Sequence, residues 1–229
     1  MAYDFLGLVN DINRRLNEVE LTSGNFATTT GYYSLAKDAV NASIRHINQE
    51  EFEWPFNHRE EEEILIPGEV RYSFPYDCKT INMNSFRIKA DSSLNVSTTK
   101  LKVLNYEEYL DKYVDYEYNS STSNRSVPTY VVRAPSNEII IVPAADKAYE
   151  VVYEYYSKGF DLNLHGDVPT LPEEYRFVII EGAMYFVYQF QNDNASARLS
   201  FERFQQGIKN LRSMFINRTE YIRDTRVHY

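Results

Sequence analysis

The chain has only one cysteine, Cys78, among its 229 residues, so it cannot form an internal disulfide bond. This fits folding in a reducing cytosol or in a particle assembled there. The longest apolar run, residues 177–188, is interrupted by Glu181 and is shorter than the ~20 residues that span a bilayer. Residues 1–4 lack the basic start and apolar core of a secretory signal. We therefore expect no disulfide and no membrane partner.

The sequence also lacks the short motifs of common catalytic and cofactor sites. It has no G-x-S-x-G, no G-x-G-x-x-G and no P-loop. No two of the four histidines (His46, His58, His165 and His228) are three to five residues apart, and with one cysteine this disfavours a zinc site. We expect these histidines to be structural or on the surface. The sequence therefore predicts no cofactor, no metal and no enzyme.

Aromatic and other hydrophobic residues are plentiful. Hydrophobic residues make up 43% of the chain, enough for the core of one or two domains. The 20 tyrosines combine a large ring with a polar tip, which suits wet subunit interfaces or half-exposed strand positions. Both interpretations of the tyrosines stay open.

Charge is distributed unevenly. Residues 198–229 carry seven basic and three acidic side chains, a net charge of +4, so residues 1–197 carry −13 of the total of −9. This asymmetry indicates a basic arm that docks on an acidic partner. The alternative is a solvated helix with a frayed end. The acidic body disfavours nucleic-acid binding, because it repels phosphate.

Two amphipathic helices are predicted near the N-terminus. The first has its apolar residues on one face, at Phe5, Val9, Ile12, Leu16 and Val19. The second begins near Tyr32 and has an apolar stripe over residues 35–47 whose first half is small, which favours close packing on another helix. The segment Trp54-Pro55-Phe56 then ends helix continuation and is interpreted as the plug where the helical part meets the next one.

The middle of the chain is predicted to be a β-region. Pro67-Gly68 suits a type II turn, and apolar segments at 64–66 and 70–74 flank it, which predicts a hairpin. Further strands are expected at 80–90, 99–104, 129–134, 138–142 and 149–157, and a short helical turn at 106–113. In the last strand Tyr149, Val151, Tyr153 and Tyr155 share one face. Residues 119–126 are polar and are expected to form a mobile loop.

Two more helices are predicted after the β-region. Thr170-Leu171-Pro172-Glu173 matches a capping box with Thr170 at the N-cap, and the helix is expected to run to about Gln191. A final helix has its apolar residues at Phe201, Phe204, Ile208, Leu211 and Phe215. The fold class is therefore α+β, a four-helix bundle with an inserted antiparallel β-domain. The predicted domains are 1–56 with 159–216, 57–158, and a C-terminal arm, 217–229.

The densest charge cluster is the run Glu60, Glu61, Glu62 and Glu63. It could bind a divalent cation, supply a glycosidase-type carboxylate pair, or line an acidic lumen or surface. Consecutive residues of a strand point to opposite faces, so the four carboxylates cannot converge on one site. The structural alternative is the solvated start of a strand.

The order of these elements resembles a known family. The elements are two N-terminal helices, the segment Trp54-Pro55-Phe56, a β-insertion, the segment Leu171-Pro172-Glu173-Glu174-Tyr175 before a helix with Gly182-Ala183, and a last helix opened by Asn192-Asp193-Asn194-Ala195 and continued by Phe204, Leu211 and Met214. In this order they are similar to the elements of the head-to-tail adaptors of tailed bacteriophages. These include the tail tubular, or ring, proteins of podoviruses. The resemblance covers nearly the whole chain in order, although each motif alone is short.

The resemblance implies a structural role in the virion tail or neck, after assembly in the host bacterial cytoplasm. Adaptors of this family form a ring of twelve below the portal protein and around the channel through which genomic DNA passes. Their helical bundles pack side by side, and the β-domain faces the tail or its fibres. In this chain the C-terminal arm would contact the portal or a neighbouring subunit through Arg212, Arg218, Tyr221, Ile222, Arg223, Arg226 and Tyr229.

Two other classes of function stay open. One is a soluble monomeric module that uses the tyrosine-rich sheet to hold a protein or a glycan. The other is an enzyme, which no residue constellation supports. The segment 114–126 has no counterpart in the family pattern.

Overall fold

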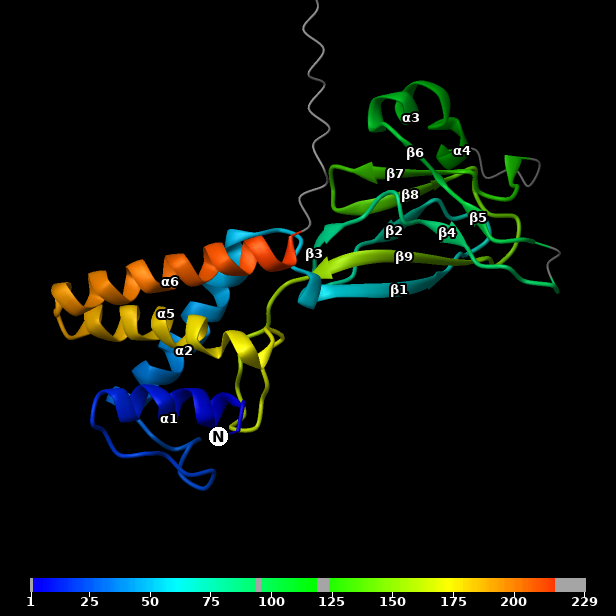
Figure 1. The fold of residues 1–229 in the computed structure, drawn as a ribbon. Coiled ribbons are helices and arrows are strands. Elements are labelled where there is room, and N and C mark those ends of the chain that lie inside the picture. The colour runs from blue at the N-terminus through cyan, green and yellow to red at the C-terminus, as the bar shows by residue number, and fades with distance from the viewer. Residues whose placement is uncertain (1, 94–95, 119–123, 217–229) are drawn as a thin grey trace, which may run out of the picture. The chain divides into compact units, whose positions relative to one another are not determined.

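The computed structural model describes residues 2–93, 96–118 and 124–216 (Figure 1). The chain divides into two compact units, residues 1–57 with 159–229 and residues 58–158. The first unit is helical and the second contains the strands. The fold is therefore α+β, as the order of predicted elements indicates.

The described residues of the helical unit form four main helices and two short 3-10 turns. They are α1 (Phe5–Arg15), α2 (Tyr32–Glu50), η1 (Pro55–Asn57), η3 (Glu173–Tyr175), α5 (Arg176–Phe190) and α6 (Asn194–Phe215). Helix α5 packs against α1, α2 and α6, and α1 also packs against α2. The helix that follows the β-unit in sequence is therefore the central one of this unit.

Local signals set the ends of α1 and α6. The side chain of Asp4 caps α1 by accepting a hydrogen bond from the Gly7 N–H at 2.7 Å. The helix ends at Arg15 with Leu16 as its C-cap, because Asn17 adopts a positive φ of 56°. The predicted extension to Val19 is therefore wrong, and the Val19 side chain is 73% exposed. At the other end of the unit Asp193 caps α6, which confirms the predicted break before it.

The predicted capping box at residues 170–173 is also wrong. The Thr170 hydroxyl donates to the side-chain oxygen of Asn57 at 3.0 Å and caps no helix. Pro172 is extended, with φ −59° and ψ 144°, and α5 begins only at Arg176, after the turn η3. A long-range hydrogen bond has taken the hydroxyl that the local pattern assigned to the helix end.

One apolar core joins the four helices. Trp54 is fully buried in this core, stacks on Phe56 at 5.2 Å between ring centroids, and donates its indole N–H to the Ile47 carbonyl at 2.8 Å. Phe204 of α6 is also fully buried. Gly182 of α5 lets the helices approach closely, because a Cβ there would lie 2.3 Å from the Ser43 hydroxyl and 2.7 Å from the Phe204 ring.

The described residues of the second unit form two sheets. The sheet strands are β1 (His58–Ile64), β2 (Arg71–Ser73), β3 (Cys78–Ile81), β4 (Arg87–Ile88), β5 (Thr99–Lys100), β6 (Lys102–Leu104), β7 (Tyr130–Ala134), β8 (Glu138–Val142) and β9 (Glu150–Ser157). One sheet has the order β1-β9-β4-β5, with β3 also beside β9, and the other has the order β2-β8-β7-β6. All pairs are antiparallel except β6 with β7, which is parallel. The predicted antiparallel pairing is therefore confirmed for the sheet β1-β9-β4-β5, whereas the sheet β2-β8-β7-β6 is mixed.

The turn at Pro67-Gly68 is confirmed, but the hairpin predicted around it is wrong. Gly68 has a φ of 88°, and the Glu69 N–H donates to the Ile66 carbonyl at 3.0 Å, as a type II turn requires. However, β1 pairs with β9 and β2 pairs with β8. The turn therefore carries the chain from one sheet to the other.

The tyrosine-rich face of β9 is core. Tyr149, Val151, Tyr153 and Tyr155 share a face as predicted, and all four are buried. Tyr153 stacks on Phe86 with 4.5 Å between ring centroids. These tyrosines therefore pack inside the unit and do not form a binding surface.

Two short helices are also part of the described residues of this unit. They are α3 (Tyr106–Lys112), which lies at the predicted helical turn and contacts β7, and α4 (Asp115–Tyr118). The segment 114–126 therefore begins with a helix that the sequence analysis missed. Residues 119–123, most of the predicted mobile loop, lie outside the described residues.

Truncation of Phe204 to Ala should lower the free energy of unfolding by about 3–5 kcal/mol, because it removes a fully buried ring from the contact between α5 and α6. Met214→Ala on the same helix is the control. That side chain is 70% exposed, so its loss should cost less than about 0.5 kcal/mol. Chemical denaturation measures both. Equal stability of Phe204→Ala and the wild type would contradict the described core.

Candidate interaction surfaces

The acidic run lies on β1 and divides between its two faces, as strand geometry predicts. Glu61 and Glu63 are opposite Tyr153 and Val151 and share their buried face. Burial, together with the nearby carboxylates of Glu61 and Glu69, raises the pKa of Glu63. The four carboxylates therefore do not form one cluster.

Glu60 and Glu62 are exposed on the other face of β1. Glu60 is directly opposite Glu154, and such a like-charged pair is destabilising. Lys89 offsets part of the negative charge, since its ammonium lies 2.9 Å from the Glu62 carboxylate and 2.6 Å from that of Glu150. These contacts lower the pKa of Glu62.

The outer edge of β1 combines charge with free backbone groups. Among the described residues its only strand partner is β9. The Leu65 N–H donates to the Tyr149 carbonyl at 2.8 Å, so by the alternation of antiparallel pairs the backbone groups of Glu60 and Glu62 point away from β9. Charged side chains on an edge strand oppose unwanted strand addition. The acidic run of β1 therefore opposes pairing of another strand at this edge.

The predicted arm contacts can be located only in part. Arg218, Tyr221, Ile222, Arg223, Arg226 and Tyr229 lie outside the described residues. Arg212 lies near the end of α6 and donates to the Glu50 carbonyl and, at 3.0 Å, to the Glu50 carboxylate. Its guanidinium is also 3.8 Å from the Glu51 carboxylate. Arg212 thus ties the end of α6 to the end of α2, a role that the sequence analysis missed.

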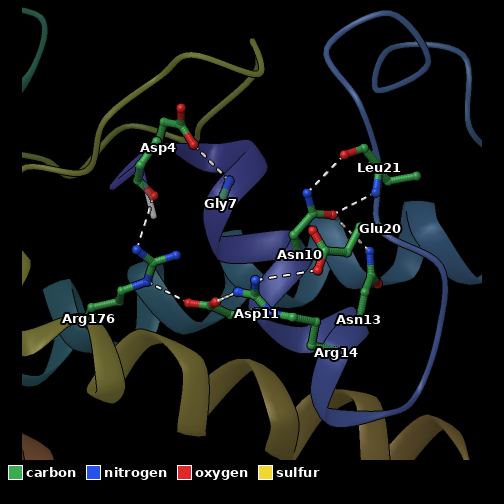
Figure 2. Close-up of polar contacts among 10 residues, drawn as sticks. Asp4, Gly7, Asn10, Asp11, Asn13, Arg14, Glu20, Leu21 and Arg176 are labelled. Carbon is green, nitrogen blue, oxygen red and sulfur yellow. Dashed lines mark hydrogen bonds and ion pairs between the residues drawn. The ribbon is translucent and has the colours of Figure 1, made fainter.

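A polar network fastens α1 to the start of α5 (Figure 2). Arg176 donates to the Asp11 carboxylate at 2.5 Å and to the Ala2 carbonyl at 3.0 Å. Arg14 also donates to Asp11 and lies 3.4 Å from the Glu20 carboxylate. Asp11 therefore receives cations from two helices that are far apart in sequence.

Asn10 holds the link that follows α1, as Figure 2 also shows. Its buried amide accepts from the Leu21 N–H at 2.7 Å and donates to the Leu21 carbonyl at 2.9 Å. Asn13 donates to the same Asn10 oxygen at 3.3 Å. This paired bond replaces the strand or helix partner that the Leu21 backbone lacks.

Glu181, which interrupts the apolar run of α5, has a structural role. It is buried, and its carboxylate accepts from the Arg15 guanidinium at 2.6 Å. A buried carboxylate is costly without such a partner. The pair therefore fixes α1 and α5 in register.

In the β-unit Arg71 is the centre of a second charged cluster. It donates to both carboxylate oxygens of Glu117, at 2.7 and 3.1 Å, and to Glu138 at 3.1 Å. The Tyr109 hydroxyl donates to Glu117 at 2.5 Å. The cluster thus fastens α3 and α4 to β2 and β8.

In the ranges 2–93, 96–118 and 124–216, no group of three or more His, Cys, Asp or Glu side chains could hold a metal ion. In that same part of the chain, no helix has the length and apolar content needed to cross a membrane.

The chain thus combines a compact helical unit with a β-unit inserted into it in sequence. Comparison with known families identifies the class as a phage adaptor. The model of the SU10 adaptor protein family matches residues 3–227, so the chain belongs to this family. No curated protein matches the chain. The resemblance to head-to-tail adaptors is thereby confirmed, and a phage adaptor is a structural component of the virion that associates with other virion components.

Replacement of Glu117 by Gln should lower the free energy of unfolding at pH 7 by about 1 kcal/mol, because it weakens charge-assisted bonds to Arg71. Arg71 also lowers the pKa of Glu117 below its ordinary value of 4.5. A carboxylate whose pKa is lowered in the folded state stabilises the fold at pH values above its ordinary pKa. This contribution is lost as the pH falls through the pKa of the folded state. The difference between variant and wild type should therefore shrink below about pH 4.5.

The matched control is Glu107→Gln, which removes the same charge from an exposed position of α3. Its effect should stay within about 0.5 kcal/mol across this pH range. Denaturant titrations at several pH values measure both. A difference between Glu117→Gln and the wild type that grows on acidification would refute the assignment.

Proposed function

We propose that the chain joins the portal of a phage head to the tail as one subunit of an oligomeric ring around the DNA channel. The single observation that carries this proposal is the family match over residues 3–227. The resemblance of element order supports a ring of twelve, with neighbouring subunits, the portal, and tail or fibre proteins as partners. Genomic DNA passes through the ring as cargo, and assembly takes place in the host cytoplasm.

In this proposal α1, α2, α5 and α6 act as one four-helix bundle, residues 1–56 with 159–216, which packs beside the bundles of neighbouring copies. Closed rings use heterologous interfaces, so each subunit needs two different faces. Several large apolar side chains of α5 and α6 are exposed and available for such packing, namely Phe177, Phe190, Leu199 and Met214. The β-domain, residues 57–158, would face the tail.

The arm, residues 217–229, is proposed to attach the subunit to the portal or to a neighbouring copy. Its basic side chains Arg218, Arg223 and Arg226 would bridge to carboxylates, and Tyr221, Ile222 and Tyr229 would anchor it. Arg212 belongs to this proposal only in part, since it already binds Glu50 within the chain. The exposed Glu60 and Glu62 are proposed to line a surface that does not grip DNA.

The alternative is a monomeric module that binds a partner through its tyrosine-rich sheet, and the tyrosines of that sheet are not available for binding. Tyr149, Tyr153 and Tyr155 are core residues, and the Tyr155 hydroxyl donates to the buried Asp77. The other face of β9 presents only Tyr156, half-buried, among its tyrosines. The observations therefore favour the adaptor.

Removal of residues 217–229 should leave the fold intact and abolish stable attachment to the portal. A sharper variant keeps the length of the arm and changes Arg218, Arg223 and Arg226 to Gln. Because charge drives the attachment, this variant should attach to the portal as weakly as the wild type does at high salt. Co-sedimentation with purified portal, followed by electron microscopy of the complex, measures attachment and ring formation.

The control changes Arg198, Arg203 and Lys209 to Gln, which removes the same charge from exposed positions of α6. This variant should attach like the wild type. If the deletion variant attaches as tightly as the full chain, the arm has no docking role. If the full chain forms no oligomer with or without portal, the ring itself is wrong.

A further inference from the structure

A basic hollow lies at one end of the β-unit. Its volume is about 360 Å³, and both sheets contribute to its wall. The lining residues come from β2, the segment between β2 and β3, β3 itself, β7, the turn between β7 and β8, and the residue after β9. They include Phe74, Tyr76, Cys78, Lys79, Arg133 and Lys158. No sequence motif links these positions, because they meet only in the folded unit.

Three cations converge on the hollow, Lys79, Arg133 and Lys158. Arg133 and Lys158 are exposed, and no carboxylate of the described residues lies within ion-pair distance of either. The Arg133 guanidinium lies 5.8 Å from the centroid of the Phe74 ring, which orients it. Both cations line the hollow together with Cys78. Burial and the Asp77 carboxylate raise the pKa of the Cys78 thiol, and Lys158 and Arg133 oppose part of this rise.

The acidic side chains nearest in sequence are already engaged. Asp77 is buried and accepts from the Tyr155 hydroxyl at 3.0 Å, and its other oxygen lies 3.7 Å from Arg59. Glu138 accepts from Arg71 at 3.1 Å and from Ser136 at 2.7 Å. Neither is part of the hollow's lining. The hollow is therefore positive within a chain whose net charge is −9.

The wall also has aromatic side chains. Tyr76 is 87% exposed and therefore accessible to a partner. A tyrosine ring loses little conformational freedom on binding and supplies a large apolar contact. An exposed tyrosine beside an unpaired arginine is typical of sites that hold a protein segment, because both residue types are enriched in protein interfaces.

We propose that this hollow binds an acidic polypeptide segment of another virion protein, with its carboxylates on Arg133 and Lys158 and its backbone against Tyr76. Carboxylate suits the site better than nucleic-acid phosphate. The β-unit itself, residues 58–158, has sixteen acidic and twelve basic side chains, so a polyanion that extends beyond the hollow is repelled. A short acidic segment meets only the local positive charge. The inference needs the hollow alone and does not depend on the ring or on the portal.

Fluorescence anisotropy at low salt tests the proposal with two labelled decapeptides, (Glu-Ala)5 and (Gln-Ala)5, and the oligonucleotide dT10. The full chain should bind (Glu-Ala)5 in preference to the other two. Arg133→Glu with Lys158→Glu should weaken this binding by about tenfold or more, because both charge contacts become repulsive. Tyr76→Ala should also weaken it, although it changes no charge.

The control pair is Lys100→Glu with Lys102→Glu, which reverses the same charge on exposed residues of β5 and β6. Binding should change less than about twofold. Equal losses in the two double variants would mean that only net charge matters, and the site would be refuted. Tighter binding of dT10 would replace it with a nucleic-acid site. If the reversed pair unfolds, Arg133→Gln with Lys158→Gln gives the same comparison, and unchanged (Glu-Ala)5 affinity overturns the proposal.

Discussion

The helical unit depends on the close approach of α5 to α2 and α6 at Gly182. A single Cβ at this position would collide with Ser43 on one side and Phe204 on the other. Ser43 comes before the β-unit in sequence and Phe204 comes after it, so this contact holds together two segments that the chain makes far apart. The ends of the long insertion must be brought together before the core of the unit can form. Folding therefore loses loop-closure entropy before core packing stabilises the unit. Salt bridges from Arg15 to Glu181 and from Arg176 to Asp11 strengthen the same junction.

Periodic patterns predicted most elements, while their partners and ends depended on contacts that no local pattern contains. The turn at Pro67-Gly68 was predictable because proline and glycine fit its two central positions wherever the chain goes next. Its hairpin was not, since strand pairing is decided by the sheets, and β9 offers β1 a longer partner than β2 does. The capping box failed for a similar reason, because Asn57 competes for the Thr170 hydroxyl.

The tyrosines show how a chain rich in this residue builds cores from amphipathic rings. Buried tyrosine rings fill space, and their hydroxyls end on nearby acceptors, as in Tyr109 with Glu117, Tyr149 with Asp146 and Tyr155 with Asp77. The sequence analysis left interface and strand roles open, and for these residues burial decides. Burial also raises the pKa of Tyr155 to about 12, so its hydroxyl stays protonated and donates at physiological pH.

The candidate surfaces were predictable to different degrees. Alternation along a strand correctly separated Glu60 and Glu62 from Glu61 and Glu63, because it depends only on backbone geometry. The partner of Arg212 and the basic hollow could not be found in this way, since each is assembled from elements far apart in sequence.

Their charges nevertheless follow one physical constraint. A protein with mostly acidic surfaces repels other copies and DNA wherever like charges meet, so charge favours contact only at the few places where the sign reverses. In this chain the sign reverses in the basic C-terminal segment and in the hollow lined by Arg133 and Lys158. Specific attachment at a few points, on a surface that otherwise repels, is what a component held among several partners requires.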